Sequence, residues 1–347
     1  MDGRAEQRLP ARVELPGGHH REQPRGGADH DLLREVDAIG GDRTRQRRAV
    51  VEAGRSAARS GVTPDSSGLV SRRGLRHARP VRVTILASGS GGNATLIQAG
   101  GRRVLVDAGI GPRVLADRMR RAFGRVLDLD AIVLTHPHGD HVGKVVPCAK
   151  AFDATVYLSE ATKRRLSLPG LRTRVFGRNA PFDVGPIRVD PMPVPHDAPQ
   201  VALVFQHKHA RAAIVTDLGH VPAGLASHLD GCQLVLLESN HDPGLLALGP
   251  YPEFLKRRIA SSVGHLSNAQ AAALMRELSS DTREIVLMHL SQKCNTPLIA
   301  MREAKKALGA RRVKLRVADQ DEPVDLRVQV AGPVRRRISD DQLALAF

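Results

Sequence analysis

The feature that most constrains this chain is a loop that holds three histidines and one aspartate within six residues, at 136–141. The loop directly follows an apolar run at 131–135 that is typical of a buried strand. Imidazole nitrogens suit zinc, and a carboxylate adds a hard oxygen ligand that also suits manganese. The first two histidines are two residues apart and can face one side, while the aspartate and the third histidine can reach a second ion. The sequence therefore predicts a metal site at the end of this strand.

Two ions need more ligands than one loop supplies, and three later residues stand where a predicted strand meets a loop. They are His196, Asp217 and His289. Taken alone, each is more often a surface or core polar residue than a ligand. Taken together with the histidine-rich loop, their positions support one another.

The predicted elements run from β-rich to helical, and then from β-rich to helical again. Strands are expected at 81–87, 94–98, 103–107, 131–135, 155–158, 173–176, 201–206, 212–216, 233–237, 284–288, 313–317 and 324–330. Helices are expected at 112–123, 142–152, 222–229, 268–278 and 297–308. The two last strands are expected to pair with each other. This order predicts an α/β (α+β) fold in which two sheets are stacked between helices.

The first 80 residues differ in composition from the rest of the chain. They are rich in Arg, Gly, Asp and Glu and contain no Phe, Tyr or Trp. Such a segment buries too little apolar surface to offset the entropy of ordering it. We therefore expect 1–80 to be a disordered or spuriously translated extension, 81–330 to be the folded domain, and 331–347 to be a basic tail.

The formal net charge of +16 points to a polyanionic partner. Residues 1–80 contain 16 Lys and Arg and 11 Asp and Glu, so the rest of the chain keeps a charge of +11. A positive field of this size attracts nucleic acid or an anionic membrane surface. Aromatic residues make up only 3% of the chain, which argues against a large single-strand surface of the stacking type.

The cysteines and the apolar segments indicate the cellular compartment in which the protein is expected. Cys148, Cys232 and Cys294 are odd in number and widely spaced, so neither a disulfide framework nor a cysteine-rich zinc site is indicated. No run of about 18 apolar residues predicts a membrane span, and the N-terminus lacks the apolar stretch of a secretory signal. We expect a cytoplasmic protein without a membrane partner. The oligomeric state is not predicted.

At the level of its motifs, the chain resembles the metallo-β-lactamase superfamily, and within it the YycJ/WalJ-type, exonuclease-like branch. The resemblance covers roughly residues 81–308. The loop at 136–141 is the superfamily motif, and the sequences ESNHD at 238–242 and GHLSN at 264–268 point to the branch. The resemblance implies an αββα four-layer sandwich with its site along one edge of the two sheets.

The resemblance also implies a set of ligands for two divalent ions, zinc or manganese. His136, His138 and His196 would hold one ion. Asp140, His141 and His289 would hold the other, with Asp217 bridging both. Asp107 would orient the histidine loop from behind the ligands, a role that carboxylates have around metals.

The implied chemistry is the attack of a hydroxide, bridging the two ions, on a phosphodiester. Asp140 would orient the nucleophile or take its proton. His265 would protonate the leaving oxygen, because GHLSN resembles the motif that carries a non-ligand catalytic histidine in RNase Z-like members. Capping of the helix near Asn268 is the alternative reading of this motif. His241, Ser267 and Asn268 are candidate substrate contacts, and capping is the simpler role for the last two.

The function predicted on these grounds is a metal-dependent phosphodiesterase, a DNA exonuclease that works 5′ to 3′ if the resemblance holds. The first alternative is a glyoxalase II-like thioester hydrolase or a small-molecule phosphodiesterase on the same fold. β-Lactamases commonly have Cys where Asp217 stands, which argues against β-lactamase activity for this chain. The second alternative is a regulatory protein that binds nucleic acid with an inactive metal site.

Overall fold

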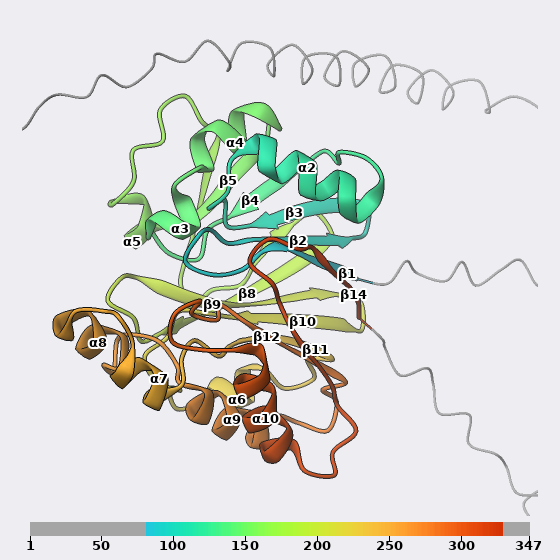
Figure 1. The fold of residues 1–347 in the computed structure, drawn as a ribbon. Coiled ribbons are helices and arrows are strands. Elements are labelled where there is room, and N and C mark those ends of the chain that lie inside the picture. The colour runs from blue at the N-terminus through green and yellow to red at the C-terminus, as the bar shows by residue number, and fades with distance from the viewer. Residues whose placement is uncertain (1–80, 329–347) are drawn as a thin grey trace, which may run out of the picture. The chain divides into compact units, whose positions relative to one another are not determined.

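The computed structural model describes residues 81–328. The predicted extension at 1–80 and the tail at 331–347 lie outside this range. Two sheets of seven strands each are stacked face to face, and helices cover the outer side of each sheet (Figure 1). None of the helices in the described range is long and apolar enough to cross a membrane.

The first sheet has the strand order β14-β1-β2-β3-β4-β5-β6. Its strands are β1 (Arg82–Ala87), β2 (Ala94–Ala99), β3 (Arg102–Val106), β4 (Ala131–Val133), β5 (Thr155–Ser159), β6 (Thr173–Phe176) and β14 (Val324–Arg327). The helices of this half are α2 (Pro112–Phe123), α3 (Gly139–Val142), α4 (Val145–Ala151) and α5 (Glu160–Lys163).

The second sheet has the order β13-β12-β11-β10-β9-β8-β7. Its strands are β7 (Phe182–Val184), β8 (Ile187–Val194), β9 (Gln200–His207), β10 (Ala210–Val215), β11 (Leu234–Glu238), β12 (Glu284–Met288) and β13 (Lys314–Val317). The helices of this half are α6 (Leu225–His228), α7 (Pro243–Leu248), α8 (Glu253–Ile259), α9 (Asn268–Glu277) and α10 (Pro297–Leu308).

Three apolar layers hold the four-layer arrangement together, and β9 shows how one strand serves two of them. Leu203 and Phe205 lie in the core between the sheets, whereas Ala202 and Val204 lie in the core beneath α9 and α10. A third core packs the first sheet against α2 and α4. Successive side chains of a strand point to opposite faces, so a fully apolar strand packs against both neighbouring layers. The expected αββα sandwich is confirmed.

The expected pairing of the two last strands is wrong. β13 adds in parallel to β12 in the second sheet, and β14 adds antiparallel to β1 in the first. A chain that returns through a helix such as α10 enters the sheet in parallel with the preceding strand. After β13, the chain crosses to the other sheet, so its first and last described strands lie side by side.

Three other expectations need correction. The helix expected at 142–152 is interrupted at residues 143–144, between α3 and α4, and only 225–228 of the helix expected at 222–229 is helical. The strands β7 and β8 were not expected. Pro191 and Pro193 lie within β8, and because proline cannot donate to a strand ladder, it argues against a central strand in a sequence.

The histidine-rich loop is held against the end of β3 by close backbone contact. The amide of Ala108 donates to the carbonyl of His141 at 2.7 Å, and the amide of Asn93 donates to the carbonyl of Asp140 at 2.8 Å. A Cβ atom at Gly109 would overlap the carbonyl oxygen of Asp140. Only glycine therefore allows the two segments to approach this closely.

We expect Gly109→Ala to lower the free energy of unfolding by about 1–3 kcal/mol, because the added methyl group would push the two segments apart. Gly139→Ala is the matched control, since a Cβ there meets open space. Its effect should stay within about 0.5 kcal/mol. Urea unfolding of both variants measures the difference, and equal stabilities would contradict the contact.

Candidate metal centre

The seven predicted ligands come together where strands of both sheets end. His136 follows β4, Asp217 follows β10 and His289 follows β12. Overlapping groups of these residues offer ligand atoms that lie within 4.8 Å of one another. The groups are His136 with His138 and His196, Asp140 with His141 and His289, and His136 with His141 and Asp217.

The arrangement of the lone pairs fits metal ions better than it fits hydrogen bonds. Nε2 of His136 and Oδ2 of Asp217 are buried and have no hydrogen-bond partner. Nε2 of His196 lies 3.1 Å from Nδ1 of His138. Buried polar atoms normally have a partner, and each unpaired one costs about 1–3 kcal/mol. Divalent ions held by these atoms would remove that cost.

The charges of the site also favour cations. Burial raises the pKa of the Asp140 carboxyl, but hydrogen bonds from His141 and His289 outweigh it, so the pKa lies below its usual range. Asp217 is likewise held ionised against burial by His289 and His141. Burial lowers the pKa of His289, but Asp217 and Asp140 raise it to about 10. In this arrangement, protons on histidines balance the carboxylates, and binding of a metal ion would displace them.

Burial lowers the pKa of His136, and the positive field of His141 adds to this effect. The ring is fully buried. A neutral imidazole is the form that binds a metal ion. His136 therefore needs no deprotonation before it can act as a ligand.

Asp107 lies behind His141. Its Oδ2 is 2.7 Å from Nδ1 of His141 and also accepts the Thr135 hydroxyl at 2.9 Å. Its Oδ1 accepts the amide of Thr135 at 2.9 Å. With Nδ1 held in this way, the Nε2 atom of His141 faces the site, 3.1 Å from Oδ2 of Asp217.

Asp197 supports His138 in a similar way. Its Oδ1 lies 3.1 Å from Nε2 of His138, so Nδ1 of that ring faces His196. Its Oδ2 accepts a hydrogen bond from Nε of Arg258 at 2.7 Å. Burial raises the pKa of Asp197, but the hydrogen bond from Arg258 outweighs this effect and lowers it. Sequence analysis gave Asp197 no role.

Glu238 is a second site residue whose role sequence analysis missed, although it begins one of the quoted motifs. It is fully buried, and its Oε1 lies 2.8 Å from Nδ1 of His265 and 3.3 Å from Nδ1 of His289. Burial raises its pKa, but His265 outweighs burial and lowers it to about 2. An acid at the end of the otherwise apolar β11 was the available signal. One buried carboxylate thus orients two histidines.

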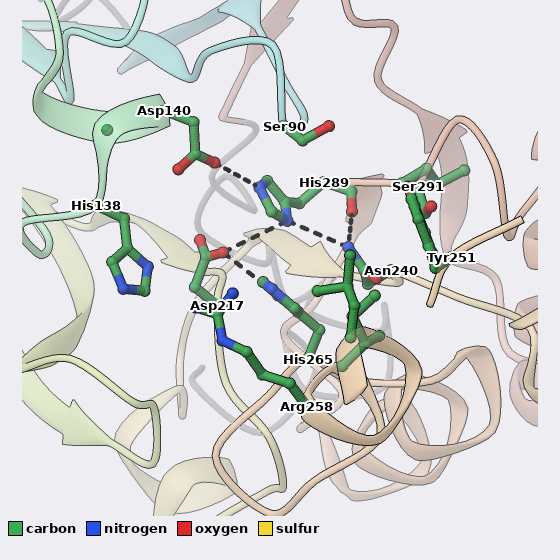
Figure 2. A pocket seen from close by; sticks show the side chains of 14 residues that line it. Ser90, His138, Asp140, Asp217, Asn240, Tyr251, Arg258, His265, His289 and Ser291 are labelled. Carbon is green, nitrogen blue, oxygen red and sulfur yellow. Dashed lines mark hydrogen bonds and ion pairs between the residues drawn. The ribbon is translucent and has the colours of Figure 1, made fainter. Parts of the chain in front are cut away.

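His265 is the predicted proton donor, and it lies in the wall of the cavity next to the ligands (Figure 2). Its Nδ1 is 2.8 Å from Glu238 and 3.5 Å from Oδ1 of Asp217. Since Nδ1 is held by Glu238, Nε2 is the nitrogen left to meet a substrate. Burial lowers the pKa of His265, but Glu238 and Asp217 raise it above its usual value.

The three predicted substrate contacts lie in a buried polar layer and do not line this cavity. Ser267 caps α9, and its hydroxyl accepts the amide of Gln270 in a capping box. Asn268 accepts the hydroxyl of Ser239 at 2.6 Å. His241 is buried and forms a β-bridge with Ser267. This placement agrees with the capping interpretation of Ser267.

The cavity has a volume of about 380 Å³ and opens onto the predicted ligands. His138, Asp140, Asp217 and His289 lie in its wall. Figure 2 shows these side chains pointing toward one another, with Arg258 and Tyr251 from the segment around α8 on another side. A space of this size accepts one end of a chain molecule or a small molecule.

Backbone strain is concentrated at this site. Asp107, Asp217 and His289 have φ angles of 60°, 58° and 57°, in the left-handed region. Each such residue costs about 1–3 kcal/mol unless its surroundings hold it in place. Asp107 and His289 directly follow a strand and Asp217 follows β10 after one residue, so each left-handed turn aims its side chain at the site where a strand ends.

A family model described as a beta-lactamase superfamily domain matches residues 102–290. The chain is 32% identical to the exodeoxyribonuclease YycJ of Bacillus anthracis over 232 residues, which cover 65% of this chain and 88% of that protein. It is 32% identical to the exodeoxyribonuclease WalJ of Streptococcus pneumoniae over 229 residues, 63% of this chain and 85% of that protein.

Among solved structures, the metallo-β-lactamase fold protein YhfI from Bacillus subtilis aligns with a TM-score of 0.56 and 19% identity. The alignment covers 71% of this chain and 99% of that one. At this identity, the likeness concerns the fold alone.

We expect Glu238→Gln to weaken metal binding by about 10- to 100-fold, because an amide keeps one acceptor oxygen, whereas Oε1 of Glu238 faces two imidazoles and Oε2 accepts the amides of Leu218 and Leu266. Glu277→Gln, at an exposed position on α9, is the matched control and should bind metal as the wild type does. Titration with a competing chelator measures the affinities. Unchanged affinity in a folded Glu238→Gln protein would contradict the orienting role.

Proposed function

This chain belongs to the beta-lactamase superfamily, as its motifs predicted, and is a metal-dependent hydrolase; from that premise, we propose that it is an exonuclease that hydrolyses phosphodiester bonds in DNA. The observation that carries the proposal is the position of His265. It is a proton donor in the same cavity wall as the ligand cluster, and Glu238 holds its other nitrogen at 2.8 Å.

The proposed cofactors are two divalent ions, zinc or manganese. His136, His138 and His196 would hold one, Asp140, His141 and His289 the other, and Asp217 both. Bound ions of this kind activate water and neutralise charge on phosphoryl oxygens. The imidazole and carboxylate donors do not by themselves distinguish zinc from manganese.

Asp140 would hold the attacking water and accept its proton. Its Oδ2 lies 3.3 Å from Nε2 of His289, and its side chain is part of the cavity wall. Its pKa is lowered, because hydrogen bonds from His141 and His289 outweigh the effect of burial, so the carboxylate is available as an acceptor at neutral pH.

His265 would give its proton to the leaving oxygen of the substrate. The carboxylates of Glu238 and Asp217 raise its pKa against the effect of burial, which favours the protonated ring. An alkoxide leaving group such as a deoxyribose oxygen needs this proton. A positioned acid of this type contributes about 10²–10⁴ in rate.

Three observations support DNA as the substrate. Two relatives that are 32% identical are named exodeoxyribonucleases. Residues 81–347 carry a formal charge of +11, which favours a polyanion. The cavity admits the end of a strand rather than a duplex, which agrees with an exonuclease. The preference for DNA over RNA rests on the relatives, and the 5′-to-3′ direction rests on the resemblance of the motifs.

A small-molecule phosphodiesterase is the second candidate, because a cavity of about 380 Å³ also suits a small diester. The thioester hydrolase has no such support, since His265 would be idle with a thiolate leaving group that departs without a proton. The convergence of all seven ligands counts against a regulatory protein with an inactive site.

We expect the wild-type protein to bind about two divalent ions and to release label from 5′- or 3′-labelled DNA only when metal is present. Asp140→Ala should reduce this activity by at least about 100-fold. Asp281→Ala, at an exposed position before β12, is the control. Labelled RNA and S-lactoylglutathione are assayed in parallel. Hydrolysis of the thioester without hydrolysis of DNA would refute the proposal.

We expect His265→Ala to slow DNA hydrolysis by about 10²–10⁴ while metal content is unchanged. On bis(4-nitrophenyl) phosphate, the loss should be much smaller, because nitrophenolate leaves without a proton. Turnover on both substrates and metal analysis test this expectation. An equal loss on both would show that His265 has another role, such as holding a metal ion.

A further inference from the structure

The segment around α8 forms one wall of the cavity without belonging to the ligand set. Tyr251, Leu255, Arg258 and Ile259 all line the cavity. None of the residues of α8 is fully buried. Figure 2 shows Arg258 below Asp217 in this view and Tyr251 at the right, next to Ser291. The proposed chemistry uses none of these four side chains.

Arg258 is held in a fixed position next to the cluster. Its Nε and one terminal nitrogen, Nη2, both contact Oδ2 of Asp197, at 2.7 and 2.6 Å. The other oxygen of Asp197 lies 3.1 Å from Nε2 of His138. The guanidinium is therefore linked to predicted ligands through Asp197, whose Oδ1 also lies 3.4 Å from Nε2 of His196.

The chemistry of Arg258 points to a phosphate. A guanidinium carries five N–H donors, and Asp197 engages only the Nε and Nη2 side, so Nη1 and the other donors remain for a ligand. Arg258 stays charged at all relevant pH values and matches phosphate oxygens in a bidentate manner. Its side chain is 55% exposed, although Asp197 holds it. A ligand can thus reach the guanidinium of Arg258, which Asp197 already orients.

The position of Arg258 determines which phosphate it can bind. The scissile phosphate would occupy the space at the ligand cluster, between Asp140, Asp217 and His265. Arg258 lines the same cavity, but in the described structure it bonds to Asp197 and not to a predicted ligand, and its side chain is 55% exposed against 24% for Asp140 and 2% for Asp217. A second phosphate, one nucleotide along the strand, would therefore meet Arg258.

The neighbours of Arg258 suit the rest of a nucleotide. Tyr251 and Leu255 give the same wall an aromatic and an apolar surface. Phe254, also on α8, exposes 68% of its surface in a chain that has seven phenylalanines. Stacking of bases on aromatic rings is tolerant of sequence and contributes about 1–3 kcal/mol per base.

We propose that Arg258 binds the phosphate next to the scissile one, so that the wall formed by α8 selects a polynucleotide over a simple phosphodiester. The proposal rests on the proposed function, because it requires a substrate with more than one phosphate. It differs from a purely structural role of Arg258 as a brace for Asp197, which would affect every substrate and the metal ions alike.

The test uses full-length Arg258→Ala and, as matched control, Arg257→Ala, whose exposed side chain is the preceding one on α8 and does not line the cavity. Both are assayed on a DNA oligonucleotide and on bis(4-nitrophenyl) phosphate, which has a single phosphate. We expect Arg258→Ala to raise KM for DNA by about 10- to 100-fold, the effect of one lost charged hydrogen-bonding pair. Its kcat on DNA and its activity on the single phosphate should match those of Arg257→Ala.

Salt dependence gives an independent readout. The slope of log(kcat/KM) against log salt concentration should become shallower by about 0.7–0.9 in Arg258→Ala, as expected for one lost phosphate contact. Equal losses on both substrates, a loss of bound metal, or an unchanged KM for DNA would overturn the role of Arg258. A wild-type protein that hydrolyses the single phosphate but not DNA would refute the exonuclease proposal as well, and the two failures are thereby distinguished.

Discussion

The structure depends on one electrostatic constraint: imidazoles and carboxylates are forced together at the edge of two sheets, where protons on the histidines balance the carboxylates until cations displace them. In the described part of the chain, Nε2 of His136 has no hydrogen-bond partner, and Oδ2 of Asp217 has only an ion-pair contact with Nε2 of His141 at 3.1 Å. Close packing at Gly109 and the left-handed turn at Asp217 work against relaxation of this arrangement. Unpaired buried atoms and strained turns both lower the free energy of unfolding. Binding of cations at this site would therefore stabilise the fold.

Three carboxylates that we do not assign as ligands orient the histidines of this centre. Asp107 holds His141, Asp197 holds His138, and Glu238 holds both His265 and His289. Each fixes one ring nitrogen and so aims the other. Glu238 ties the orientation of the proposed acid to that of a ligand, while Asp197 connects a ligand to α8. The same carboxylates thus hold residues of the metal centre, the proposed proton donor and the wall formed by α8.

The sequence predicted the sandwich and the set of converging polar residues, because these depend on local patterns such as an apolar strand that ends in a histidine. It could not predict contacts made by residues far apart along the chain. Glu238 meets His265 and His289 across 27 and 51 positions, and no local pattern marks such a pairing. Because of Pro191 and Pro193, the sequence did not predict β8. The last two strands were predicted to pair with each other because they are neighbours in sequence, whereas the structure pairs them with β12 and β1.

The junction of the first and last described strands has a consequence for how the protein is made. β1 pairs with β14, and Arg82 forms its ion pair with Asp325, 243 positions later. During synthesis, the edge of the first sheet at β1 therefore stays open until almost all of the folded region has left the ribosome. The nascent chain must keep that edge from pairing with other chains. Only then can the protein reach the state that acquires its ions.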